Sequence, residues 1–178
     1  MKMMLRNTYI GLFFLVICYS GFGQSESSFI KFKIKNAGLY TNGYFSQYNF
    51  DLYYNKANPQ QSKFNGTLRA SSINTGVTMR DNHLRSKEYF NVLDFPEIIF
   101  ISSNINVISS NELNVSGTLN IKGISKKVSF NVKVSSDTNK DVLNATLVLN
   151  RLDFGIGKSS WTLSDVVSLN LRYTQENK

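Results

Sequence analysis

His83 is the residue best suited to acid–base chemistry, because it is the single histidine of the chain and Asp81 lies two positions before it. A histidine can serve as a general base or as a metal ligand near neutral pH. Both roles need partners, and the surrounding sequence offers no second histidine, no cysteine and no paired-carboxylate motif. We therefore predict no catalytic residue, no metal site and no cofactor, and keep a hydrolase that uses His83 with Asp81 as the weakest alternative.

The other motifs of enzymes are missing or incomplete. The chain has no Gly-x-Ser-x-Gly elbow, no Gly-x-x-x-x-Gly-Lys loop and no Gly-x-Gly-x-x-Gly fingerprint. The tripeptide Asp153-Phe154-Gly155 also occurs in protein kinases, but its companion motifs are absent here and it follows an expected strand. A turn is the better interpretation of this tripeptide.

Two arginines flank the histidine, and they have two possible roles. Arg80 and Arg85 could form a polar network with Asp81 and His83 that fixes a helical turn. Alternatively, Arg80, His83 and Arg85 could contact the polar head of a ligand, since cationic groups orient anionic heads. The sequence leaves both interpretations open.

The first 23 residues have the features of a secretory signal peptide. Lys2 and Arg6 precede an apolar run over 9–19, and small residues follow at Gly21 and Gly23. This order predicts cleavage before Gln24 and export of the protein, which is then periplasmic or secreted. The run is short for a membrane span, so we expect no stable membrane insertion after cleavage, with a retained N-terminal anchor as the alternative.

Cys18 is the only cysteine and lies inside this segment. A lipoprotein is a second alternative, but Ile17 stands where the acylation motif needs a small residue. Cleavage leaves a chain without cysteine, which excludes disulfides, thiol nucleophiles and thiolate metal sites.

The remaining residues, 24–178, suit one domain with a core of its own. Cleavage removes Lys2 and Arg6 and lowers the net charge from +8 to about +6. The basic residues are dispersed, and the densest group is Lys31, Lys33 and Lys35, whose spacing places them on the outer face of a strand. Dispersed charge and an exported location argue against nucleic acid as a partner.

Apolar residues recur mostly at every second position, which is typical of half-buried strands. The clearest alternation is that of Leu113, Val115, Leu119 and Ile121 with the polar residues between them. Eight such runs predict strands at 30–34, 48–54, 64–73, 97–107, 113–121, 128–134, 143–149 and 167–173. Residues 122–126 read as a hairpin connection, and both prolines, Pro59 and Pro96, lie outside the runs.

One segment breaks the alternation. Residues 79–90 are rich in charge, carry Asp81 and Asn82 as possible helix caps, and contain Leu84 and Phe90 as apolar anchors. We predict a short helical segment near residues 80–90 that covers one end of the fold.

Eight amphipathic strands can form either a two-sheet sandwich or a barrel. A membrane barrel would carry aromatic girdles at both ends, which are not evident. The interior of an eight-stranded barrel is wide enough to be filled by side chains or to hold one small ligand. We predict that inward apolar residues from six strands contact such a ligand, namely Phe32, Phe50, Leu119, Phe130, Leu147 and Leu169.

Several ordered motifs make the chain resemble the YceI-like family over about residues 29–173. The motifs are Ser71-Ser72-Ile73-Asn74-Thr75-Gly76, Arg80-Asp81-x-His83-Leu84-Arg85-Ser86, Tyr89-Phe90-Asn91-Val92, Phe95-Pro96-Glu97-Ile98-x-Phe100, Val115-Ser116-Gly117-Thr118-Leu119-x-Ile121-Lys122-Gly123 and Arg151-x-Asp153-Phe154-Gly155-Ile156. The resemblance implies an all-β, single eight-stranded antiparallel lipocalin-like barrel that binds a polyisoprenoid or similar lipid and is not an enzyme. It also implies that the segment from Arg80 to Ser86 lies near the barrel mouth.

The function that follows is extracytoplasmic binding or carriage of an isoprenoid or similar amphiphilic lipid inside the barrel. The main alternative is a structural or partner-binding barrel with a side-chain-filled interior. The sequence does not determine the oligomeric state.

Overall fold

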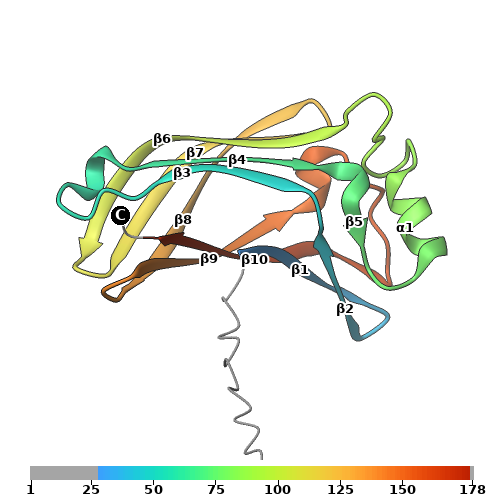
Figure 1. Ribbon diagram of the computed structural model, residues 1–178. Coiled ribbons are helices and arrows are strands. Elements are labelled where there is room, and N and C mark those ends of the chain that lie inside the picture. The colour runs from blue at the N-terminus through green and yellow to red at the C-terminus, as the bar shows by residue number, and fades with distance from the viewer. Residues whose placement is uncertain (1–27, 177–178) are drawn as a thin grey trace, which may run out of the picture.

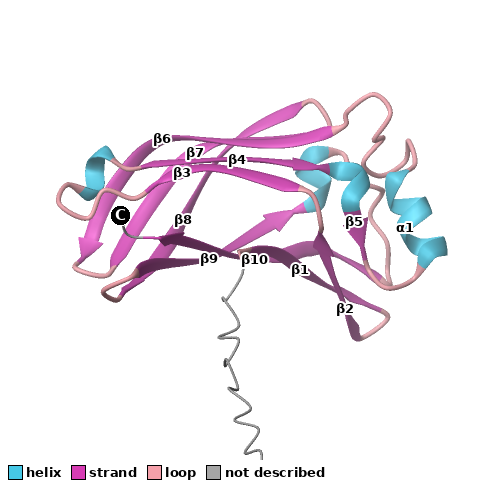
Figure 2. Ribbon diagram, viewed as in Figure 1, coloured by secondary structure: helices cyan, strands magenta, loops and turns pink. Residues whose placement is uncertain are grey.

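The computed structural model describes residues 28–176, so the expected signal peptide lies outside the described residues. Antiparallel strands form one strongly curled sheet, with short helical segments at its ends (Figures 1 and 2). The strands are β1 (Phe29–Asn36), β2 (Leu39–Phe45), β3 (Tyr48–Tyr53), β4 (Lys63–Arg69), β5 (Ile73–Asn74), β6 (Glu97–Ser109), β7 (Glu112–Ile121), β8 (Ile124–Ser136), β9 (Lys140–Asn150) and β10 (Leu163–Glu176). The helices are α1 (Thr78–Arg85) and the 3-10 turns η1 (Pro59–Gln61), η2 (Ala70–Ser72) and η3 (Arg151–Phe154).

The sheet order is β3-β4-β6-β7-β8-β9-β10-β1-β2-β5. Its two end strands continue other strands of the same sheet, because β3 follows β2 in the chain and β5 follows β4. β2 pairs with β1 and β5, and after a two-residue bend the chain continues as β3, which pairs with β4. Hydrogen bonds from the Ser46 amide to the Ser72 carbonyl and from the Arg69 amide to the Gln47 carbonyl span the bend. β2–β3 and β4–β5 are therefore two bent strands, and the ten strands trace an eight-stranded ring.

A side chain completes the ring where β3 passes β10. The Gln175 amide accepts a hydrogen bond from the Tyr54 amide nitrogen and donates one to the Tyr54 carbonyl, at 2.9 and 3.2 Å. It thus makes the two bonds that a strand residue would make with its neighbour. The predicted all-β barrel fold is confirmed.

The prediction omitted β2, because its alternation is weak. Gly43 and Phe45 are buried and Thr41 is half-buried, whereas Tyr40 and Tyr44 are exposed. Of the three inward positions only Phe45 is large and apolar, and two outward positions are tyrosines, so the sequence pattern hides which face lies inside.

The connection between β7 and β8 is shorter than the predicted 122–126. Ile121 pairs with Ile124, and Lys122 and Gly123 both have positive φ, as a two-residue type I′ turn requires. Ala37 and Gly38 form the same kind of turn between β1 and β2.

The predicted helical segment is present, but the caps predicted for it are wrong. α1 begins at Thr78 after Val77, which makes no side-chain cap. Asp81 lies inside the helix and is buried, so neither it nor Asn82 caps the helix. The remaining residues of the segment form turns after Arg85.

Two apolar clusters divide the interior. One fills the end of the barrel away from α1 with tightly buried side chains from β3, β4 and β6 to β9, namely Tyr54, Phe64, Ile105, Leu113, Val115, Val132, Val134 and Leu143. The other surrounds the half near α1, where many of its members are only partly buried, including Phe32, Phe50, Phe100 and Phe130. The interior is therefore solid at one end and loosely filled at the other.

Gly117 of β7 provides a test of the packing between β7 and β6. A Cβ atom there would collide with the Ile101 carbonyl oxygen and would lie 2.5 Å from the Phe100 ring. Because a backbone atom cannot move aside cheaply, we expect Gly117→Ala to lower the free energy of unfolding by about 2 kcal/mol in urea denaturation. Gly66→Ala is the matched control, since its Cβ would make ordinary contact with Phe50 at 3.7 Å. Equal stability of the two variants would contradict this packing.

Candidate functional site

A cavity of about 370 Å³ extends through the barrel interior from the segments around α1 to the second apolar cluster, of which Phe64, Val132 and Leu143 line its wall. Its volume falls within the range of small-molecule sites. Its wall consists mainly of aliphatic and aromatic side chains from the inner faces of the strands, together with Leu84, Tyr89, Phe90, Phe154 and Ile156 from the segments that cover the end. The cavity is thus suited to an apolar ligand rather than to a polar one.

Several polar residues of the wall come from one end of the barrel, whereas Asn65, Thr67 and Arg172 lie on the strands β4 and β10. Asn36 and Thr41 come from the β1–β2 hairpin, Thr75 and Arg80 from β5 to α1, and Arg151 from η3. All of these elements lie at one end of the molecule (Figure 1). We call this the α1 end, made by the β1–β2 turn, residues 75–96, the β7–β8 turn and residues 151–163.

Eight of the nine predicted ligand-binding residues line the cavity. They are Phe32, Phe50, Leu119, Phe130, Leu147 and Leu169 on the strands and Arg80 and His83 on α1. The strand residues gather there because strand side chains alternate between the two faces of the sheet. Their contact with a ligand stays a prediction.

Arg85, the ninth, does not lie on the cavity wall. Its Nε and Nη2 atoms donate to the carbonyls of Ser71 and Ile73 at 2.8 and 2.9 Å, and Nη1 donates to Asn82 Oδ1 at 3.1 Å. Arg85 therefore fastens α1 to η2 and β5.

Arg80 is held at the cavity wall by Thr75. Its Nε donates to Thr75 Oγ1 at 2.8 Å and its Nη2 to the Thr75 carbonyl at 2.9 Å. Thr75 in turn donates its amide and its hydroxyl to the buried Asp81 carboxylate at 2.9 and 2.5 Å. Asp81 thus orients Thr75, which orients the guanidinium.

His83 lies at the rim of the cavity. Its ring packs edge-to-face on Tyr89 with a centroid distance of 4.8 Å, and Nε2 lies 3.5 Å from Glu88 Oε2. Asp81 points to Thr75 instead, so the Asp81–His83 pair that a hydrolase would need is not formed.

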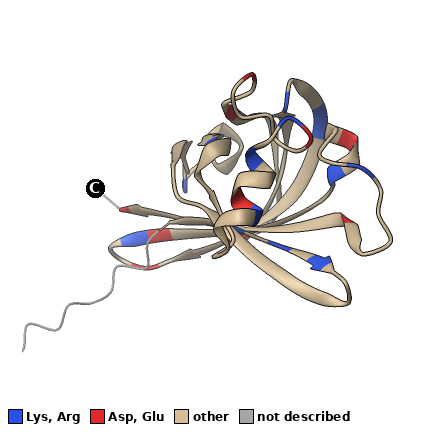
Figure 3. Ribbon diagram, turned by 90° about the vertical axis from the view of Figure 1, so that its right-hand side faces the viewer, with Lys and Arg blue, Asp and Glu red and all other residues tan. Residues whose placement is uncertain are grey.

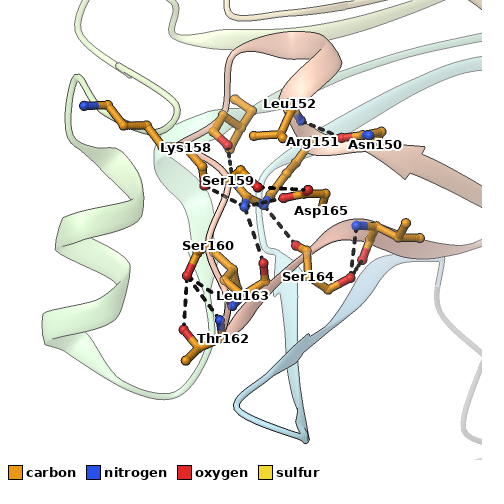
Figure 4. A network of polar contacts seen from close by, with 12 residues as sticks. Asn150, Arg151, Leu152, Lys158, Ser159, Ser160, Thr162, Leu163, Ser164 and Asp165 are labelled. Atoms are coloured by element: carbon orange, nitrogen blue, oxygen red, sulfur yellow. Dashed lines mark hydrogen bonds and ion pairs between the residues drawn. The ribbon is translucent and has the colours of Figure 1, made fainter.

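Arg151 was not among the predicted site residues, although it belongs to a quoted motif. It is 4% exposed and lines the cavity. Its guanidinium donates to the carbonyls of Ser164, Ile156 and Lys158 at 3.0, 2.7 and 2.8 Å, and Nη2 bonds to Asp165 Oδ1 at 2.7 Å (Figure 4). The sequence signal that could have identified Arg151 is a single arginine directly after an apolar strand. A guanidinium buried at such a position needs several hydrogen-bond acceptors, which the following loop can supply.

Lys122 joins two of the covering segments to each other, and Phe90 joins one of them to β2. Lys122 Nζ donates to the Gly155 carbonyl at 2.8 Å and to the Glu88 carbonyl at 3.3 Å. Partial burial lowers the pKa of the Lys122 ammonium, against the opposing effect of Glu88. Phe90 also meets Phe45 edge-to-face at 6.1 Å.

A metal centre is not evident in the described part of the chain. Residues 28–176 contain no group of three or more histidine, cysteine, aspartate or glutamate side chains that could hold an ion. Over the same residues, no helix is long and apolar enough to cross a membrane.

Comparison with known proteins gives the same family as the motifs. The family model of the YceI-like domain matches residues 24–174. The chain belongs to the YceI-like family. Protein YceI of Salmonella arizonae is 30% identical over 112 residues, which cover 62% of this chain and 58% of that relative, so the chain aligns with less than two thirds of the relative's length.

Two solved structures share the fold of this YceI-like chain. BcnA of Burkholderia cenocepacia superposes with a TM-score of 0.80 at 24% identity, covering 83% of this chain and 96% of BcnA. A polyisoprenoid-binding domain from Saccharophagus degradans, implicated in plant cell wall breakdown, gives a TM-score of 0.64 at 14% identity, covering 85% and 94% of the two chains. At these identities the two likenesses show the fold.

The Arg151 network gives a prediction about the covering loop. Arg151→Gln removes the buried cation and leaves Asp165 and the loop carbonyls short of donors. We expect the free energy of unfolding to fall by about 3 kcal/mol in urea denaturation. Arg69→Gln, on the exposed face of β4, is the control and should change it by about 0.5 kcal/mol or less. A loss at Arg151 no larger than that at Arg69 would show that the network does not hold the loop.

Proposed function

We propose that this protein binds the apolar chain of an isoprenoid or similar amphiphilic lipid inside its barrel, and that it is a carrier rather than an enzyme. The observation that carries the proposal is the apolar cavity with a positioned guanidinium at its outer end. The polyisoprenoid-binding domain of the same fold supports this choice of ligand class.

The tail supplies most of the affinity in this account. Each methylene transferred from water into an apolar site contributes about 0.8 kcal/mol, so ten of them contribute about 8 kcal/mol before the costs of association. The aromatic and aliphatic wall offers this gain without directional contacts. Specificity for chain type should therefore be broad.

The head group would lie at the α1 end. Arg80 is the best candidate to meet an anionic head, because the Asp81–Thr75 contacts fix its position on the wall. Arg151 is engaged by Asp165 and by loop carbonyls, and Arg85 lies off the wall. His83 is the second candidate, at the rim.

The alternatives receive less support from the geometry. A hydrolase would need a base for its nucleophile, and His83 lacks Asp81 as a partner. A side-chain-filled barrel would leave no room for a ligand, whereas a cavity is present. We further propose that the protein acts outside the cytoplasm, in the periplasm or as a secreted protein, on the strength of the basic, apolar and small residues in the first 23 positions.

Filling the cavity should abolish binding. Ala145 of β9 lies on the wall, and Ala145→Phe would place a ring where the tail is expected. We expect its affinity for geranylgeraniol to fall by roughly tenfold or more in a calorimetric titration, because apolar contact area is replaced by protein. Val148→Phe, on the outer face of the same strand, is the control and should bind as the unaltered protein does.

Circular dichroism of both variants checks that the barrel is intact. Unchanged affinity in a folded Ala145→Phe protein would contradict binding in the cavity.

Arg80 should distinguish charged from neutral ligands. We expect Arg80→Gln to weaken binding of geranylgeranyl monophosphate by roughly tenfold, because a charge-assisted hydrogen bond is lost, and to leave geranylgeraniol binding unchanged. Arg85→Gln is the matched control, since its guanidinium bonds to η2 and β5 and should affect stability but not head-group preference. A loss of equal size for the alcohol and the phosphate would assign Arg80 a structural role only.

A further inference from the structure

The most exposed large apolar side chains gather at the α1 end. Among residues 28–176, five such side chains are more exposed than Val148, which is 60% exposed. They are Leu39, Tyr40, Met79, Leu93 and Trp161. All five lie on the β1–β2 hairpin, on residues 75–96 or on residues 151–163, which are the elements around the outer end of the cavity.

The opposite end of the barrel has a different surface. Its connections, 54–62, 110–111 and 137–139, are polar and include lysine, asparagine, glutamine, serine and aspartate. Val107 and Ile108 near the end of β6 are about half exposed, at 46% and 52%. Strong exposure of apolar side chains is thus a property of the α1 end and not of loops in general.

The exposed side chains are carried by elements that the structure holds together. The Ala37 amide donates to the Thr162 carbonyl at 2.8 Å, and Asn36 pairs with Leu163. The tip that carries Leu39 and the loop that carries Trp161 are therefore fixed beside each other. Arg85 fastens the helix of Met79 to β5, which pairs with β2.

Basic side chains accompany these tips. Lys35, Lys87 and Lys158 are exposed on the same elements, and Figure 3, which faces the α1 end, shows Lys and Arg on the segments that surround it. Several acids of this end are already engaged: Asp81 accepts from Thr75, Glu88 lies by His83, and Asp94 accepts from Asn91. Residues 75–96, 122–123 and 151–163 together carry six basic and four acidic side chains, the exposed Asp153 among the acids, so this end combines apolar tips with a small excess of positive charge.

We infer that the α1 end is a docking surface for an anionic lipid bilayer. Tryptophan and tyrosine favour the interface between water and membrane, and lysines beside them favour anionic head groups. The apolar side chains belong to three separate segments, the β1–β2 hairpin, residues 75–96 and residues 151–163, rather than to one face of the sheet, which suits shallow insertion into a deformable surface better than packing on a rigid protein.

Docking in this orientation would place the cavity opening against the bilayer. A lipid tail could then pass between the membrane and the barrel without crossing water, which removes the main cost of its transfer. The binding is peripheral and reversible, and no strand needs to enter the membrane. Bilayer docking goes beyond lipid carriage, and either can fail without the other.

Trp161 is the only tryptophan of the chain and therefore reports on this surface directly. The exported protein is mixed with vesicles of phosphatidylglycerol and phosphatidylcholine, and with vesicles of phosphatidylcholine alone. We expect the Trp161 emission to shift to the blue with the anionic vesicles and the protein to float with them. The shift should weaken at high salt, because screening reduces the attraction of the lysines.

Two pairs of variants test which residues dock. Leu39→Ser with Met79→Ser, and separately Lys35→Glu with Lys158→Glu, should each lower the vesicle partition coefficient by roughly tenfold or more. Val148→Ser with Ile101→Ser, on the barrel wall, and Lys56→Glu with Lys133→Glu, away from the α1 end, are the matched controls and should change it less than twofold. All variants share the same N-terminal segment, so any contribution of that segment cancels.

Three results would overturn the inference: no Trp161 shift with anionic vesicles, equal losses in the wall controls, or a concentration-dependent shift without vesicles, which would indicate a second copy of this chain as the occupant. Geranylgeraniol binding without vesicles is measured on the same samples. A protein that binds the alcohol but not vesicles retains the carrier function and loses only the docking surface, and the reverse result removes only the carrier function.

Discussion

The ring of strands encloses more space than its inward-facing side chains fill. Only at the end away from α1 do side chains pack with no contact to the cavity, as Leu113 and Val115 do, which are almost inaccessible. Near α1 the ring of strands encloses more volume than its side chains occupy, and the cavity is what remains. The side chains that line an empty apolar cavity lack dispersion contacts on one side. A bound lipid tail would supply these contacts and would therefore stabilise the folded barrel.

The covering segments depend on two guanidinium groups that donate to backbone carbonyls, the buried one of Arg151 and the partly exposed one of Arg85. Arg151 gathers the carbonyls of the η3–β10 loop around one cation, and Arg85 bonds η2 and β5 to α1. Neither segment has the strand partners that order the rest of the chain. Polar bonds to backbone carbonyls therefore replace strand pairing at the α1 end, and they leave Arg80 and His83 facing the cavity.

The sequence was sufficient for the fold class because alternation is strong where one face is buried. It located most strands, and Leu113 to Ile121 shows why, since every second residue there is buried. It failed at β2, where Thr41 and Gly43 face inward, and it placed a cap at Asp81, whose carboxylate instead serves Thr75. Among the site residues, the positions of Phe32 and Leu169 followed from alternation, but the roles of Arg85 and Arg151 depend on loop folding that no local pattern encodes.

The central claim is that the cavity holds a lipid tail, and native mass spectrometry of the purified protein tests it most directly. The account predicts a complex that is heavier than the polypeptide by the mass of one lipid, a loss of that mass after organic extraction, and an isoprenoid or similar amphiphile in the extract. A protein that is isolated at the mass of its polypeptide and takes up no isoprenoid when one is supplied would contradict it.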